Sequence, residues 1–358
     1  VLTFRPEFNP NWNAYSYQSQ LTLTRLRPES VSEIVKRLTK GKKLPQELID
    51  EISRKTDGIP LFVEELTKNL LESEYLTETE HGFELVGALD AMSIPSTLHD
   101  SLMARLDRLG SAREAAQLAS VIGREFSLEL LMDISEFPEP VLKANLDTLI
   151  DAELVMMRGV YPKASFIFKH ALIRDAAYQS MLRSDKQKLH QEIADSLIAK
   201  SGTTSMVQPE VIAIHLSEAG NIEKALQYWR LAGEEAIKSS ANSEAVEHIR
   251  HGLALLHKLP MGTFRNETEL TLLSLLGPAL IATKGYGAME TAQCWERARE
   301  LTRIVTDSPQ LFPTLYGCWV YKLTWAEFPA TKDMAREFLS LAESSEDSGA
   351  IITGPVSY

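Results

Sequence analysis

Apolar residues return every three or four positions along most of the chain, which predicts a mainly helical protein. The pattern begins at Ser30, whose hydroxyl can accept hydrogen bonds from the free amide groups of a first helix. Proline and glycine separate the apolar runs that follow. The predicted helices cover 30–38, 45–56, 61–71, 97–109, 113–122, 127–134, 139–151, 170–182 and 185–200.

Short extended segments interrupt the helical pattern. The β-branched and aromatic residues of 1–5 predict a strand that ends at Pro6, and alternating segments occur at 20–23 and 82–86. A pair at 154–157 and 165–168, joined by a turn that contains Gly159 and Pro162, predicts a hairpin. Three or four helices closed by a hairpin are typical of a winged helix.

From Pro209 onward the sequence pattern predicts only helices. Their small and large residues have the spacing of tetratricopeptide (TPR) repeats. A small residue lets the neighbouring helix approach while an aromatic fills the next layer. The positions are Ala225, Trp229 and Ala232, and then Ala245, Ile249 and Gly252. Further helices are predicted at 267–283, 287–306, 309–325 and 329–344, as a degenerate helical array.

Length and charge limit the function classes. A chain of 358 residues, 44% of them hydrophobic, predicts two or three packed units. A net charge of −12 argues against non-specific binding to nucleic acid or to an anionic membrane. Cys294 and Cys318 fit neither a metal site nor a disulfide framework, so a cytoplasmic location is expected. The sequence contains no apolar run of about 18 residues, so no membrane span is predicted.

Both ends of the chain have the pattern of cuts through a longer protein. The sequence opens on Val1 inside an apolar run, with no leader pattern, and stops at Tyr358 without a closing helix pattern. The phosphate-binding pattern G-x-x-x-x-G-K-[ST] is absent, because Gly41-Lys42 lacks the earlier glycine and the following hydroxyl. No acidic strand end is evident to hold Mg²⁺, so these residues alone should not hydrolyse ATP.

Three sequence runs resemble the carboxy-terminal part of a bacterial signalling ATPase of the STAND class. They are Thr3-Phe4-Arg5-Pro6-Glu7-Phe8, the run Arg54-Lys55-Thr56-Asp57-Gly58-Ile59-Pro60-Leu61-Phe62-Val63-Glu64-Glu65-Leu66, and Phe168-Lys169-His170-Ala171-Leu172-Ile173-Arg174-Asp175-Ala176-Ala177-Tyr178. The resemblance extends over most of the chain, and the thirteen-residue run from Arg54 is its most specific part.

The resemblance implies a nucleotide role for four residues. Arg5 would sense nucleotide phosphate from the end of a strand, where a guanidinium can bind phosphate bidentately. Pro60 would pack on the adenine, and Gly58 would permit a tight entry to the following helix. His170 would reach the β-phosphate of ADP from a helix start, with Ala171 where many relatives carry Asp.

Each of these residues also has a purely structural interpretation. Arg5 after a strand could form a surface salt bridge, and Gly-Ile-Pro could be only a helix start with proline in the first turn. His170 could cap its helix or pack inside the winged helix. The sequence leaves these alternatives open.

The resemblance also implies a domain order. Residues 1–29 would be the tail of a P-loop nucleotide-binding α/β domain, and residues 30–93 a helical lid with the Gly-x-Pro motif. Residues 94–202 would be a winged helix, and residues 203–358 a truncated TPR-like α-solenoid. Such proteins are often joined to class III adenylate or guanylate cyclase domains, kinases or transcriptional activators.

The implied function is a signal-transduction switch. ADP held between lid and winged helix would keep the molecule closed, and exchange for ATP would open it and favour oligomerisation. The array would bind a protein partner or signal, Mg²⁺ would require the upstream domain, and the intact protein would be an ATPase. The chain itself would carry no catalytic residue.

Two other functions stay open. The TPR-like array could be a nucleotide-independent scaffold for a partner protein. The winged helix could bind DNA, but the helix 139–151 offers one Lys against three acidic side chains, which disfavours phosphate contact. Adjacent carboxylates such as Glu64 and Glu65 point about 100° apart on a helix, and the eight His are scattered, so no acid–base pair or metal site is predicted.

Overall fold

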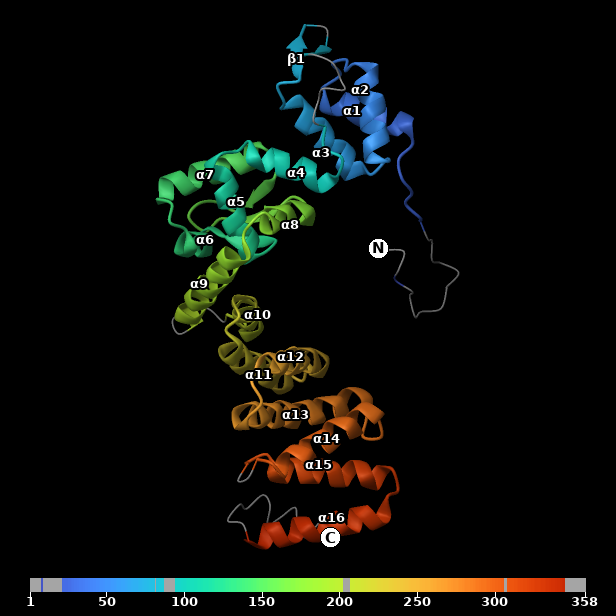
Figure 1. Cartoon of the computed structure of the whole chain (residues 1–358), viewed down its shortest axis with the longest axis vertical. Helices are drawn as coiled ribbons and strands as arrows, with labels where there is room; N and C mark the ends of the chain where they lie inside the picture. The colour runs from blue at the N-terminus through green and yellow to red at the C-terminus, as the bar shows by residue number, and fades with distance from the viewer. Residues whose placement is uncertain are drawn as a thin grey trace. The chain divides into compact units, whose positions relative to one another are not determined.

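The computed structural model describes Phe8 and residues 21–80, 82–86, 94–201, 207–305 and 308–344, and helices dominate it (Figure 1). The chain divides between Gly110 and Ser111 into two compact units, each described by itself below. The predicted strand over residues 1–5 lies outside the described residues. Residues 21–27 form neither helix nor strand. No helix in the described part of the chain is long and apolar enough to cross a membrane.

The first unit packs its helices around one apolar core. Its helices are α1 (Pro28–Leu38), α2 (Gln46–Thr56), α3 (Pro60–Leu71) and α4 (Leu98–Asp107). The core contains Val31, Val35, Leu48, Ile52, Phe62, Val63, Leu66 and Leu70, which recur at helical spacing. The helix packed against α3 is α4, so contacts place it with the first unit, although the sequence predicted it as part of the winged-helix region.

The start of α1 differs from the sequence prediction. Pro28 occupies the first turn, where its missing N–H has no cost, and the residue before it, Arg27, is the N-cap. Ser30 therefore lies inside the helix, and its predicted role as the cap is wrong. A favourable proline at the first position outweighs a capping hydroxyl two residues later.

A small hairpin belongs to the same unit. Strands β1 (Leu76–Thr79) and β2 (Gly82–Leu85) pair antiparallel, with Leu76 opposite Leu85. The sequence predicted only the second of these strands, because Thr and Glu dominate the first. Gly82 also contacts the carbonyl of Lys43 closely, which leaves no room for a side chain.

The second unit begins with helices around a three-stranded sheet. The order is α5 (Ser111–Ile122), β3 (Glu125–Ser127), α6 (Leu128–Ile134), α7 (Glu139–Asp151), β4 (Val155–Arg158), β5 (Ser165–Phe168), α8 (Ala171–Gln179) and α9 (Arg183–Ser201). The sheet is antiparallel with the order β3-β5-β4. Buried Phe126, Phe166 and Phe168 fill the space beside it, with ring centroids of Phe126 and Phe166 5.5 Å apart. The predicted hairpin is present.

The rest of the second unit is a helical array. Its elements are α10 (Pro209–Ala219), α11 (Ile222–Lys238), α12 (Asn242–Leu255), the short η2 (Leu256–Lys258), α13 (Thr263–Lys284), α14 (Met289–Thr302), α15 (Leu311–Thr324) and α16 (Phe328–Ser344). Each helix from α9 onward packs against the next one in sequence (Figure 1). Contacts between sequence neighbours are typical of repeat architectures.

Small residues set the spacing of the array. The predicted small positions Ala225, Ala232 and Gly252 are buried, and a side chain at Gly252 would press on Leu272. Trp295 of α14 lies against two glycines, Gly277 of α13 and Gly317 of α15. Its indole ring is 2% exposed. A Cβ at either glycine would occupy the same space as the indole carbons, so a larger residue at either position would force the indole or a helix to shift.

We predict that Gly277→Ala lowers the free energy of unfolding by about 1–3 kcal/mol, because the indole of Trp295 must shift in a filled core. The loss should appear although alanine favours a helix over glycine by about 1 kcal/mol. Urea denaturation measures it. Gly262→Ala is the control, since nothing lies within 4 Å of its Cβ. Equal stability of both variants would contradict the packing account.

Candidate functional site

The predicted Gly-x-Pro motif forms a tight turn between α2 and α3. Asp57 and Gly58 both take left-handed conformations, with φ of 48° and 66°. The Leu26 N–H donates to the Gly58 carbonyl at 2.8 Å. A Cβ at Gly58 would collide with the Leu26 backbone. Glycine is therefore required here both for its conformation and for the close approach of another backbone segment.

The same turn presents apolar side chains to solvent. Pro60 is exposed in the first turn of α3, and the preceding Ile59 is 42% exposed. Arg25 pairs with Asp57 on the surface of the turn. The turn thus fixes Pro60 at a position where another group could pack against its ring.

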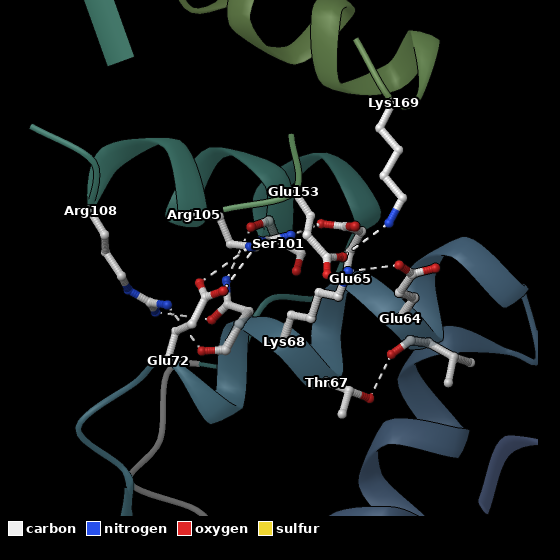
Figure 2. Close-up of polar contacts among 12 residues, drawn as sticks. Glu64, Glu65, Thr67, Lys68, Glu72, Ser101, Arg105, Arg108, Glu153 and Lys169 are labelled. Carbon is white, nitrogen blue, oxygen red and sulfur yellow. Dashed lines mark hydrogen bonds and ion pairs between the residues drawn. The ribbon is translucent and has the colours of Figure 1, made fainter. Parts of the chain in front are cut away.

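A buried ion pair anchors α3 to α4 behind the motif (Figure 2). Glu65 of α3 is fully buried and pairs with Arg105 of α4, which is 2% exposed. Arg105 also donates to the Glu72 carboxylate at 3.2 and 3.3 Å. Arg108 donates to the Asn69 carbonyl and to its side-chain oxygen, both at 3.0 Å. Glu65 thus has a structural role, and the polar contacts fix the register between the two helices.

His170 is the N-cap of α8 in the second unit. Its φ of −132° and ψ of 143° are extended, and its side chain forms no capping hydrogen bond. The Nε2 atom is buried and has no hydrogen-bond partner in the part of the chain that the structure describes. The adjacent Lys169 pairs with Glu153 at 3.1 Å (Figure 2). Its backbone N–H donates to the Leu154 carbonyl at 3.0 Å. The backbone thus fixes the place of His170, and no described residue satisfies its Nε2.

The predicted site residues fall in separate parts of the chain. Gly58 and Pro60 share one turn of the first unit, and His170 belongs to the second unit. Arg5 lies outside the described residues. In the described part of the chain, no group of three or more His, Cys, Asp or Glu side chains is placed to hold a metal ion.

Sequence reasoning missed a polar cluster in the second unit. The Nδ1 atoms of His190 on α9 and His215 on α10 lie 2.8 Å apart, and each ring is 4% exposed. The Tyr178 hydroxyl lies 3.1 Å from Nε2 of His190. At most one Nδ1 of the pair can carry a proton, so the two rings cannot both be charged. The residues are too far apart in sequence for any spacing rule to pair them.

Burial keeps both imidazoles neutral. Desolvation lowers the pKa of His215 to about 4. Desolvation, together with the charges of His215 and Arg174, lowers the pKa of His190 to about 4. Arg174 stands over the Tyr178 ring at 5.1 Å and donates through Nε to the Ser120 carbonyl at 2.9 Å. The cluster therefore joins α5, α8, α9 and α10 through the neutral imidazoles and the Arg174 cation.

Comparison with known proteins gives distant relatives only. No family model matches the chain. An uncharacterised protein of Rhizobium meliloti (strain 1021) is 27% identical over 352 residues, which is 97% of this chain. The chain spans 33% of that relative's length.

A solved structure shows a weak likeness to the chain. It is a Signal Transduction ATPase with Numerous Domains (STAND) protein with a tetratricopeptide repeat sensor, from Pyrococcus horikoshii. The likeness covers 90% of this chain and 48% of that one, with a TM-score of 0.36 and 12% identity. This level of similarity carries no argument about fold or activity.

We predict that Gly58→Ala destabilises the chain by about 2 kcal/mol or more, because alanine is strained at positive φ and its Cβ meets the Leu26 backbone. Gly41→Ala is the matched control. Gly41 also has positive φ but open space around it, so the loss should be only about 1 kcal/mol. Thermal unfolding measures the stability of both variants. An equal loss of stability in the two would show that the close approach of the Leu26 backbone to Gly58 contributes little.

The histidine pair predicts a loss of stability in acid. Unfolded His has a pKa near 6.5 and takes up protons before the folded rings do, so stability is complete above pH 6.5 and falls as the pH drops toward 4. The loss should be on the order of 2 kcal/mol per ring between pH 6.5 and 5. Urea denaturation at several pH values measures this slope.

His215→Gln should flatten that slope, and His257→Gln, at an exposed position, should leave it unchanged. A slope that is the same in His215→Gln and in the unmodified chain would contradict the assignment to the buried pair.

Proposed function

We propose that this chain is the regulatory and interaction part of a nucleotide-dependent signalling switch of the STAND class. The observation that carries the proposal is the Arg54–Leu66 run. Its resemblance to the Gly-x-Pro motif is supported by a turn that requires Gly58 and leaves Pro60 exposed for an adenine ring. The chain contributes nucleotide contacts and no catalytic residue.

The second contact of the proposed switch is His170. A neutral or charged imidazole can donate Nε2–H to a phosphate oxygen, and this Nε2 has no hydrogen-bond partner among the described residues. The free amide groups of the first turn of α8 add positive potential at the same point. Ala171 supplies no carboxylate beside it.

The arrangement around His170 is compatible with the proposed winged helix. The order helix, strand, helix, helix and hairpin, with the sheet order β3-β5-β4, has the connectivity of that domain. In the proposed switch, ADP binds the closed state more tightly than the open one, and this difference in affinity sets the population of each state. Arg5, Pro60 and His170 supply the difference, and Mg²⁺ and hydrolysis depend on an upstream domain.

The proposed whole protein works in the cytoplasm and forms oligomers in its ATP state. A fused cyclase domain, which the resemblance also implied, has no support from either relative. We leave it out of the proposal.

A second candidate function is binding of a partner protein by the array. Large apolar side chains are exposed around one contact, in which the Trp325 indole N–H donates to the Gly287 carbonyl at 3.2 Å. They are Tyr286, Met289, Trp325 and Phe328, exposed by 41 to 63%. Clustered exposed aromatic residues are typical of protein-binding surfaces. The switch and this binding role are compatible.

DNA binding has less support. On α7, the helix that would enter a groove, Lys143 already pairs with Glu139 at 2.7 Å and lies 4.9 Å from the Tyr161 ring. The hairpin exposes the apolar residues Met156, Met157 and Val160, and its exposed Arg158 lies 3.9 Å from the Glu125 carboxylate. We therefore propose no DNA-binding role.

We predict that His170→Ala in the full-length protein speeds ADP release about tenfold, through the loss of one hydrogen bond to a charged phosphate. Stopped-flow release of a fluorescent ADP analogue measures the rate. His99→Ala, at an exposed position of α4, is the control and should leave the rate unchanged. An unchanged rate in His170→Ala would remove His170 from the nucleotide site.

A further inference from the structure

The second unit contains a pocket of about 400 Å³ that the proposed nucleotide site does not use. Helices α5, α8, α9 and α10 supply its walls, and the volume lies within the range of small-molecule sites. Apolar side chains from two helices form one part of the lining: Val121 and Ile122 of α5, and Val211 and Ile214 of α10. Ile214 is 48% exposed on the array although it borders the pocket.

The buried histidine pair lies at the wall of this pocket. His215 lines it, and the Nδ1 of this ring bonds to His190 while Nε2 has no hydrogen-bond partner among the described residues. Only 4% of the His215 side chain is exposed. The Nε2 atom is therefore the polar atom that His215 can offer to a ligand in the pocket.

The tautomers of the pair are linked. If Tyr178 O–H donates to His190 Nε2, then His190 Nδ1–H donates to His215 Nδ1, and His215 carries its proton on Nε2. In this state His215 offers a donor to the pocket. An anionic group in the pocket would select this state, because it accepts the Nε2–H.

Opposite charges border the same space without pairing. Arg174 and Glu218 both line the pocket, and the salt bridges of the described residues include none between them. The Arg174 guanidinium uses Nε on the Ser120 carbonyl and Nη1 on Asp175, which leaves donors on Nη2. Glu218 is exposed and has no partner among the described side chains. Lys186, over the Tyr178 ring at 4.6 Å, is the other charge close to the cluster.

We propose that this pocket binds a free amino acid with an apolar side chain. Its carboxylate binds Arg174 and the Nε2–H of His215, its ammonium group binds Glu218, and its side chain packs against Val121, Ile122, Val211 and Ile214. A ligand with only one charge would leave either the Nη2 donors of Arg174 or the Glu218 carboxylate without a partner. The proposal is independent of nucleotide binding.

The position of the pocket gives the ligand a regulatory effect. Helices α5 and α8 belong to the sheet-containing part of the second unit, and α10 begins the array. A ligand bound to Arg174 on α8 and to Glu218 on α10 adds contacts between these parts. Binding therefore stabilises one placement of the array relative to α8, the helix whose N-cap is His170.

Isothermal titration calorimetry on the whole chain tests the proposal with leucine, isoleucine, valine, methionine and phenylalanine as probes. At least one should bind. Two analogues separate the charged contacts: leucinamide lacks the carboxylate, and 4-methylpentanoate lacks the ammonium group. Each should bind about tenfold more weakly than leucine, as expected for one lost charged contact.

Glu218→Gln completes the test, with Glu223→Gln, another exposed position, as its matched control. Glu218→Gln should weaken the binding of leucine about tenfold and leave the affinity for 4-methylpentanoate unchanged. The control variant should bind both ligands as tightly as the unmodified chain does. Binding of none of the five amino acids, or unchanged leucine binding in Glu218→Gln, would overturn the proposal. Thermal unfolding of both variants checks that each is folded.

Discussion

Close approach between helices is the constraint on which the array depends. Helix axes approach most closely where one helix presents a small residue to a large residue of its neighbour. Trp295 meets Gly277 on one side and Gly317 on the other, and Gly252 lies against Leu272 in the same way. A larger side chain at any of these glycines would therefore disturb the packing of the neighbouring helix.

The residues of functional interest are placed by backbone geometry and buried polar contacts. Gly58 is fixed by its positive φ and by the Leu26 backbone, and the Glu65–Arg105 pair holds α3 behind it. His170 ends a hydrogen-bonded segment between β5 and α8. The histidine pair joins α9 to α10 without a net charge. Rigid elements thus present Pro60, the Nε2 of His170 and the pocket.

The helices could be predicted from sequence because their apolar periods are regular, and so could the turn at Gly58 and the small positions Ala225 and Gly252. Strand β3 could not be predicted because three residues are too few for an alternating pattern. The prediction of Ser30 as a cap was wrong because the helix begins two residues earlier, at Pro28. Arg105 with Glu65, and His190 with His215, are pairs that only the packing of separate helices brings together. Arg5 stays a prediction outside the described residues, as do the domain boundaries.

The central claim is that this chain belongs to a protein whose state is set by a bound nucleotide. The most direct test is the nucleotide content of the full-length protein as purified, released by acid and separated by chromatography. The account predicts close to one ADP per chain, held through desalting. Protein that is folded and free of nucleotide, and that neither ADP nor ATP stabilises against thermal unfolding, would contradict it and leave the helical array as a nucleotide-independent scaffold.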